Sequence, residues 1–191
     1  MANPRVRPHL EFFPVDAKGY TSDAIHGSRW LHELDPDLLS PVIRHSGQEF
    51  FVLEPAATVR QEIYMPFRWF RRSGEMFAKA WAMAPTENNG DVGWLIRKDT
   101  VLEVPISDFT SSFPFLIHTA QSRGIPDPRN ILGQLEKDEK GNCTVSSWTQ
   151  TDPSKGNRWR SLAEGHDVLA FPIWLYCDDT SGNSRDRKSV V

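Results

Sequence analysis

Residues 67–106 read FRWFRRSGEMFAKAWAMAPTENNGDVGWLIRKDTVLEVPI, and this stretch decides the fold. Aromatic and β-branched runs are interrupted there by turn residues at Ser73-Gly74 and at Asn88-Asn89-Gly90-Asp91, and two further runs cover 92–98 and 101–106. Turn signals spaced roughly ten residues apart between such runs are typical of an antiparallel β-meander. We therefore predict a small twisted sheet over 67–106, either an SH3-like barrel or an open sheet.

Large aromatic side chains supply the expected core of this sheet. Burial of such side chains dominates the energetics of a small sheet, and four are placed to fill one side of it: Trp69, Phe77, Trp81 and Trp94. The pattern changes to a helical one after Ile106. Ser112 can cap a helix there, Pro114 suits its first turn, and Gly124 supplies its end.

The regions outside the meander differ in composition. We expect an irregular N-terminal arm with a short helix over 1–47, and the meander with its helix over 48–124. Residues 125–156 are rich in Pro, Asp, Lys, Gly and Ser, which predicts a loop or linker. A helix and a separate C-terminal strand follow over 157–183, and 184–191 form a disordered tail. The predicted fold class is α+β.

The bulk composition limits the function classes. The 191 residues include 22 basic and 25 acidic ones, a formal net charge of −3. No global field therefore draws the chain to nucleic acid or to an anionic membrane, and any such contact must be local. Two cysteines without Cys-x-x-Cys spacing indicate a reducing compartment. We expect an intracellular protein of the nucleus or cytoplasm, with no membrane partner.

A short basic and aromatic run is the candidate nucleic-acid surface. Arginines and an aromatic ring alternate there and could contact a phosphate backbone and stacked bases: Arg68, Trp69, Arg71 and Arg72. The alternative is an ordinary half-buried strand whose guanidinium groups are solvated, and strand alternation places Arg68 and Arg72 on the face opposite to Trp69.

An acidic pair follows the last apolar run of the chain. Residues 168–177 are apolar on both pleat faces, which indicates a buried strand, and Asp178 and Asp179 come directly after it. Carboxylates at the end of a central strand are where a divalent metal is often held. The alternative is that Asp-Asp-Thr-Ser-Gly-Asn forms a simple turn.

The segments 156–160 (GNRWR) and 170–183 (AFPIWLYCDDTSGN) resemble uncharacterised, transposon-derived proteins of mushroom-forming fungi. These proteins look related to transposases of the CACTA (En/Spm) and KDZ type. Weaker likeness extends over much of 67–183, through Arg68-Trp69-Phe70, Phe77-Ala78-Lys79 and the Ile131-Leu132-Gly133 patch.

The resemblance implies the start of an RNase H-like fold, whose dispersed carboxylates hold a divalent metal such as Mg²⁺. Either Asp178 or Asp179 would be the first of these metal ligands. Because residues 184–191 depart from the pattern, we expect a catalytically incomplete fragment with residual contact to DNA or metal. The alternative is a non-enzymatic module, built on the 67–106 meander, that binds protein or nucleic acid.

Overall fold

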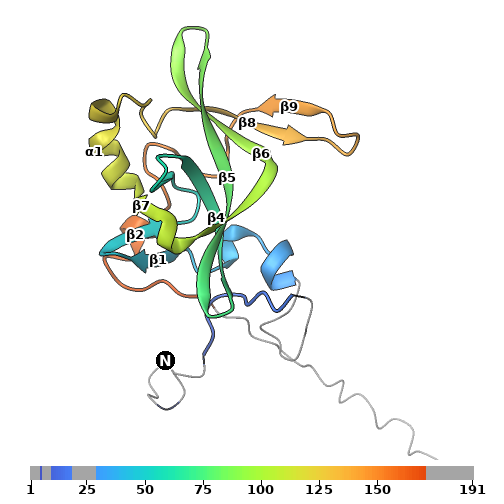
Figure 1. The fold of residues 1–191 in the computed structure, drawn as a ribbon, viewed down its shortest axis with the longest axis vertical. Helices are drawn as coiled ribbons and strands as arrows, with labels where there is room; N and C mark the ends of the chain where they lie inside the picture. Colours follow the sequence, from blue (N-terminus) through green and yellow to red (C-terminus); the bar gives the residue numbers. More distant parts are fainter. Residues whose placement is uncertain (1–4, 6–9, 19–28, 171–191) are drawn as a thin grey trace, which may run out of the picture.

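A computed structural model describes residue 5, residues 10–18 and residues 29–170. The fold is α+β and consists mainly of open β-sheet, which confirms the predicted class and its open-sheet variant (Figure 1). The main sheet has seven strands in the order β7-β3-β4-β5-β6-β8-β9, and a separate hairpin pairs β1 with β2.

The strands and helices have the following bounds. The strands are β1 Val42–His45, β2 Gln48–Phe51, β3 Ala56–Thr58, β4 Ile63–Arg72, β5 Glu75–Asn88, β6 Asp91–Pro105, β7 Phe109–Ser111, β8 Ile131–Lys137 and β9 Cys143–Ser146. Within the described residues, the helices are α1 Phe113–Arg123 and α2 Trp159–Leu162, the π-helical turn η3 Arg29–Glu33, and the 3₁₀ turns η4 Pro36–Leu38 and η5 Ile106–Asp108.

Two tight turns build the predicted meander. Ser73 and Gly74 have φ angles of 52° and 86°, and Asn89 and Gly90 have 53° and 88°. Positive φ at both central residues defines the type I′ turn, whose twist matches that of the flanking strands. Strands β4, β5 and β6 therefore pair antiparallel in sequence order. The β5–β6 hairpin projects from the body at the top of Figure 1.

The break between the predicted runs 92–98 and 101–106 is a bulge within one long strand. Ala82 pairs with Arg97 and Ala80 pairs with Leu102, so residues 98–101 of β6 lie opposite Trp81 alone. Extra residues on one strand bend it and increase its local twist. The polar Lys-Asp-Thr step therefore bends β6 and does not reverse it. The strand pairs with β5 on both sides of the bulge, and its residues 94–97 also pair with β8.

The predicted loop or linker over 125–156 is wrong for two segments, which form strands β8 and β9. Strand β8 lies parallel to β6, with Trp94 paired to Ile131, and β9 returns antiparallel to β8. The polar residues between them form the hairpin tip, where Gly141 has φ 84°. Parallel strands require a long crossover, and here η5, β7 and α1 supply it.

Helix α1 agrees with the sequence prediction. Ser112 occupies the N-cap position, and Gly124, at φ 65°, ends the helix in the left-handed conformation. Its buried side is formed by Phe113, Leu116 and Ala120, whereas Phe115 is exposed. The predicted irregular arm over 1–47 is wrong for residues 42–45, because these form β1 and pair with β2.

Three of the four predicted core aromatics belong to the hydrophobic core. These are Trp69, Trp81 and Trp94, and Trp69 is only 1% exposed. Phe77 is the exception among the four predicted core aromatics. It pairs across the strands with Phe70, and the two rings stack at 5.6 Å on the face opposite to Trp69.

Candidate functional site

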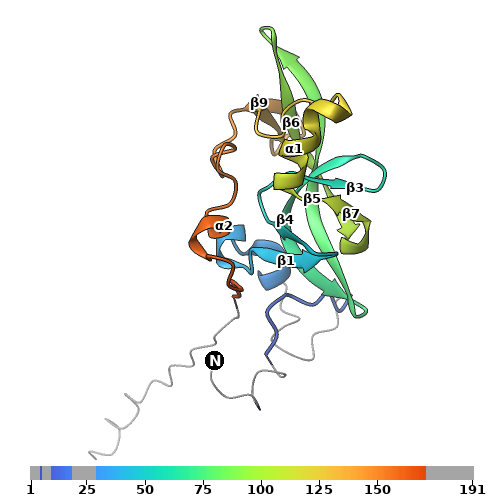
Figure 2. The ribbon, with the colours of Figure 1, turned by 90° about the vertical axis from the view of Figure 1, so that its left-hand side faces the viewer.

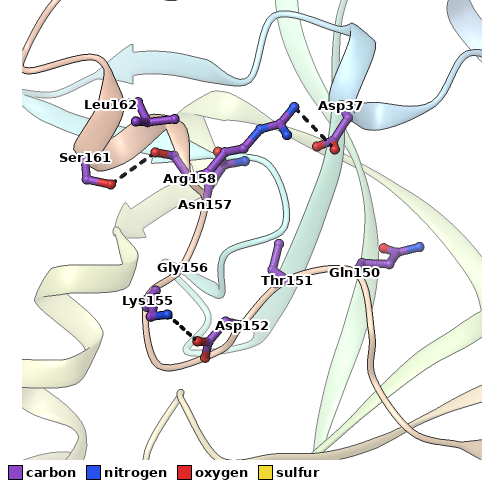
Figure 3. Close-up of a pocket in the computed structure, with 10 residues that line it drawn as sticks. All are labelled: Asp37, Gln150, Thr151, Asp152, Lys155, Gly156, Asn157, Arg158, Ser161 and Leu162. Carbon is purple, nitrogen blue, oxygen red and sulfur yellow. Dashed lines mark hydrogen bonds and ion pairs between the residues drawn. The ribbon is translucent and has the colours of Figure 1, made fainter.

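A polar pocket of about 410 Å³ lies where the chain passes from β9 to α2 (Figure 3). Residues of the 150–158 loop and of α2 line it, together with Asp37 from η4. Figure 2 shows α2 close to the first part of the chain, and an ion pair of 3.5 Å between Arg158 and Asp37 joins them. The pocket therefore forms between segments far apart in the sequence.

A buried carboxylate supports the loop that forms this pocket. Glu54 is 1% exposed, and its Oε1 atom accepts a hydrogen bond of 2.9 Å from the backbone N–H of Asn157. The guanidinium of Arg160 donates to both carboxylate oxygens, over 2.9 Å from Nε and 2.6 Å from Nη2. The side chain of Asn157 donates to the carbonyl of Val52 over 2.9 Å. These bonds fix the loop and α2 against the strand connection after β2.

The charges of the pocket are paired with one another. Lys155 lies 3.3 Å from Asp152, and both are exposed, as are Arg158 and Asp37. Exposed ion pairs contribute little and exchange readily with water. The pocket can therefore accommodate a small polar molecule by hydrogen bonding, and its charges give no net preference for an anion or a cation.

The predicted nucleic-acid residues do not share one exposed face. The Trp69 ring lies in the core, where its Nε1–H donates to the carbonyl of Pro41 over 3.3 Å. Arg68 points to the opposite face and is 2% exposed. Arg71 and Arg72 are half-buried, and Arg71 pairs with Glu11 at 3.2 Å. In this arrangement no nucleobase can stack on Trp69, and nucleic-acid binding by the run stays a prediction.

The predicted metal ligands, Asp178 and Asp179, lie outside the described residues, as do most of the predicted C-terminal strand and all of the tail over 184–191. The three described residues of that strand, 168–170, have no strand conformation. Within the described part of the chain, no group of three or more His, Cys, Asp or Glu residues is placed to hold a metal ion.

Strand β9 forms an exposed edge that the sequence analysis missed. All its residues are exposed, and it is the last strand of the seven-stranded sheet. The β8–β9 hairpin projects sideways from the body in Figure 1. Strand edges are usually protected by a charge, a proline or a bulge. The β9 sequence Cys-Thr-Val-Ser has neither a charge nor a proline.

The turn of the hairpin determines which backbone groups of β9 point outward. The N–H of Asp138 donates to the carbonyl of Asn142 over 2.9 Å. Hydrogen-bonded pairs recur at every second residue of an antiparallel ladder. Thr144 and Ser146 therefore bond to β8, while the N–H and C=O groups of Cys143 and Val145 point away from the sheet.

The side chains of the hairpin differ between its two faces. On one face the Gln134 amide donates to the Ser146 hydroxyl over 3.1 Å, and Glu136 pairs with Lys98 at 2.6 Å. On the other face Leu135 lies opposite Val145, which is 64% exposed. One face of the edge is therefore polar and internally bonded, and the other is apolar.

The opposite edge of the sheet is protected. Strand β7 has two buried residues out of three. The side-chain amide of Gln48 donates to the carbonyl of Thr110, in the middle of this strand, over 2.8 Å. The two edges of one sheet therefore differ, and among the described strands β9 is the accessible end.

Residues 42–169 match the model of a family described as Domain of unknown function (DUF8591). The chain belongs to this family. The DUF8591 domain begins with β1 and ends shortly after α2, so it includes the predicted linker, the β8–β9 hairpin and the Glu54–Arg160 pair. No curated protein and no solved structure matches the chain. None of the helices described is long and apolar enough to cross a membrane.

Proposed function

We propose that this chain is a protein-binding module that takes up an extended segment of a partner protein at the edge of β9. Its platform is the predicted meander, lengthened by the β8–β9 hairpin. The observation that carries the proposal is the exposed, uncharged edge strand with outward-pointing backbone groups at Cys143 and Val145. Strand addition uses such groups for affinity and neighbouring side chains for selectivity.

The chemistry of the edge indicates the kind of segment that would bind. Each outward N–H or C=O that finds a partner contributes about 1 kcal/mol net to the binding free energy. The four groups can therefore position a strand, but stable binding also needs side-chain contacts. Val145 and Leu135 provide an apolar surface on one face. We expect the bound segment to be extended and to place a β-branched or aromatic side chain over Val145.

A proline substitution on the edge tests this proposal. Val145→Pro removes one outward N–H and leaves the bonds between β8 and β9 intact, because proline is tolerated where a strand N–H faces solvent. Val145→Thr is the matched control, since it keeps the N–H and the branched shape. Peptides selected from a displayed random library against the full chain are the probes.

The expected result is a set of peptides that bind the native chain and the Val145→Thr variant, and bind Val145→Pro at least about tenfold more weakly, a loss of 1.4 kcal/mol. Amide exchange at Cys143 and Val145 should slow when such a peptide binds. Equal binding to the proline variant would show that the peptides use another surface and would contradict the proposal.

Descent from a transposase-like protein is a separate proposal, on the origin of the chain. The resemblance of residues 156–183 supports it, and DNA is the partner that it suggests. A gel-shift titration at rising salt tests this, because phosphate contacts weaken steeply as salt increases. Lack of binding to any DNA at low salt would contradict residual DNA contact and would leave the β9 proposal unaffected.

A further inference from the structure

Two cationic side chains lie almost fully buried beside each other on β4 and β5. Arg68 and Lys79 are paired in the register of these strands, and their exposures are 2% and 8%. Paired residues of antiparallel strands project from the same face with Cβ atoms about 5 Å apart, and like charges there repel each other. A buried arrangement of this kind needs negative charge or hydrogen-bond acceptors nearby.

Uncharged groups are the direct partners of both cations. Nη2 of Arg68 donates to the backbone carbonyl of Leu34, directly after η3, while its Nε and Nη1 atoms are buried without a hydrogen-bond partner in the described structure. Nζ of Lys79 lies 2.8 Å from Nδ1 of His32. Neither the backbone carbonyl nor the imidazole carries a negative charge. Two buried donor atoms of Arg68 therefore stay unsatisfied in the described structure.

The nearby carboxylates bind a third cation. Asp16 and Glu103 both pair with Arg72, and the distance from Glu103 to Nη1 is 2.7 Å. Burial lowers the pKa of Lys79, and Arg68 lowers it further against the opposing effect of Glu103. Among the described side chains of this face, three cations of β4 and β5 therefore stand beside two acids. Glu103 is also the register neighbour of Lys79 on β6, and the excess positive charge lies at Arg68 and Lys79.

We propose that Arg68 and Lys79 form a binding site for an anionic group, a phosphate or a carboxylate, over which η3 closes. Such a group would accept hydrogen bonds from the unsatisfied guanidinium atoms and from the ammonium. It would take the place of the Leu34 carbonyl and the His32 ring. This inference is independent of strand addition at β9.

The cover over this site is small. Trp30 and Leu31 of η3 are buried, whereas His32 and Glu33 on the same turn are exposed. The ring of Phe70, whose centroid lies 5.9 Å from Lys79 Nζ, forms one wall of the site. Displacing a single helical turn therefore opens the site and leaves the pairing of β4 with β5 intact.

Thermal unfolding of the full chain in inorganic phosphate tests the proposal, with sodium chloride at matched ionic strength as reference and acetate as a second arm. A ligand that binds the folded state raises the Tm by an amount that grows with the logarithm of its concentration above Kd. We expect this rise in phosphate for the native chain and its loss in Arg68→Met and Lys79→Met. Arg71→Met, which removes a half-buried arginine paired with Glu11, should keep it.

The arms of the experiment separate the possible ligands. A rise of the Tm in phosphate but not in acetate assigns the site to phosphate. An equal rise of the Tm in both salts shows that the site also accepts carboxylates. An equal rise in chloride, or a phosphate effect unchanged in both methionine variants, would overturn the proposal. Should a variant fail to fold, indole NMR signals of the native chain decide. Phosphate should then shift the indole signal of Trp30 in η3. The signal of Trp94, whose indole N–H donates to the Pro126 carbonyl, should not change. A Trp30 signal that does not move would overturn the site.

Discussion

Arg160 binds the buried carboxylate of Glu54 from a position 106 residues later in the chain. The guanidinium also lies 4.4 Å from the centroid of the Phe51 ring and donates to the carbonyl of Glu49 over 3.2 Å. One side chain therefore joins α2 to β2 and to the connection that follows it. The predictions below begin with this pair.

Replacement of Arg160 by methionine should destabilise the fold. Arg160→Met leaves the Glu54 carboxylate buried without its charged partner, which costs about 3 kcal/mol of unfolding free energy. Arg158→Met is the matched control, because its exposed pair with Asp37 contributes less than about 1 kcal/mol. Urea unfolding followed by circular dichroism measures both variants, and similar losses in the two would contradict the role of the buried pair.

Alanine at position 156 should also destabilise the chain. Gly156 has φ 72°, and a Cβ atom there would lie 2.5 Å from Oε1 of Glu54. We expect Gly156→Ala to lower the free energy of unfolding by about 2 kcal/mol or more, from backbone strain and displacement of the carboxylate together. Gly165→Ala separates these causes, because Gly165 has φ 82° and open space around it. Equal losses would show that backbone strain alone accounts for the effect.

The contact between His32 and Lys79 should make stability depend on pH. Burial, and next the charge of Lys79, lowers the pKa of His32 below its ordinary value of 6.5, and Arg68 adds to this while Asp16 and Glu103 oppose it. The unfolded chain then binds more protons, so the free energy of unfolding falls as pH drops below about 6.5. Because His32 is exposed on its outer side, we expect a loss below about 1 kcal/mol.

A glutamine at position 32 provides the comparison for this pH effect. His32→Gln keeps an acceptor for Lys79 and does not titrate. From about pH 7.5 to pH 5 the native chain should therefore lose unfolding free energy relative to the variant. Urea unfolding across this range measures it. A constant difference would mean that His32 does not contribute to acid sensitivity.

The tip of the β8–β9 hairpin depends on Asp138. Its carboxylate accepts hydrogen bonds from the Asn142 side chain over 3.0 Å and from the backbone N–H groups of Asn142 and Lys140. Asp138→Ala should speed amide exchange at Thr144 and weaken peptide binding at β9. Glu139→Ala, one residue further along, should change neither quantity. Exchange rates measured by NMR that agree between the two variants would count against this account.

The parts of the fold that local sequence determines could be predicted. Ser73-Gly74 and Asn89-Gly90 specify type I′ turns by their tolerance of positive φ, and Ser112 and Gly124 mark the ends of α1. The β1–β2 hairpin carried a similar signal at Ser46-Gly47, where both φ angles are positive. That signal could have placed a strand within the region assigned to an irregular arm.

The parts that depend on distant contacts could not be predicted. Strand alternation does place Arg68 and Trp69 on opposite faces, but it cannot reveal that both faces are covered there. The pairing of β8 with β6 joins segments separated by a whole helix. Glu54 gives no local sign that it will be buried, because its partner Arg160 comes from α2.

The hydroxyl of Ser40 links both ends of the described body. It lies 2.6 Å from the carbonyl oxygen of Phe12 and accepts a hydrogen bond of 2.9 Å from the N–H of Ala170. Figures 1 and 2 place these ends away from the β5–β6 tip and from the β8–β9 hairpin. A surface anchor attached at these ends of the described body would therefore leave the projecting hairpins accessible in an immobilised assay.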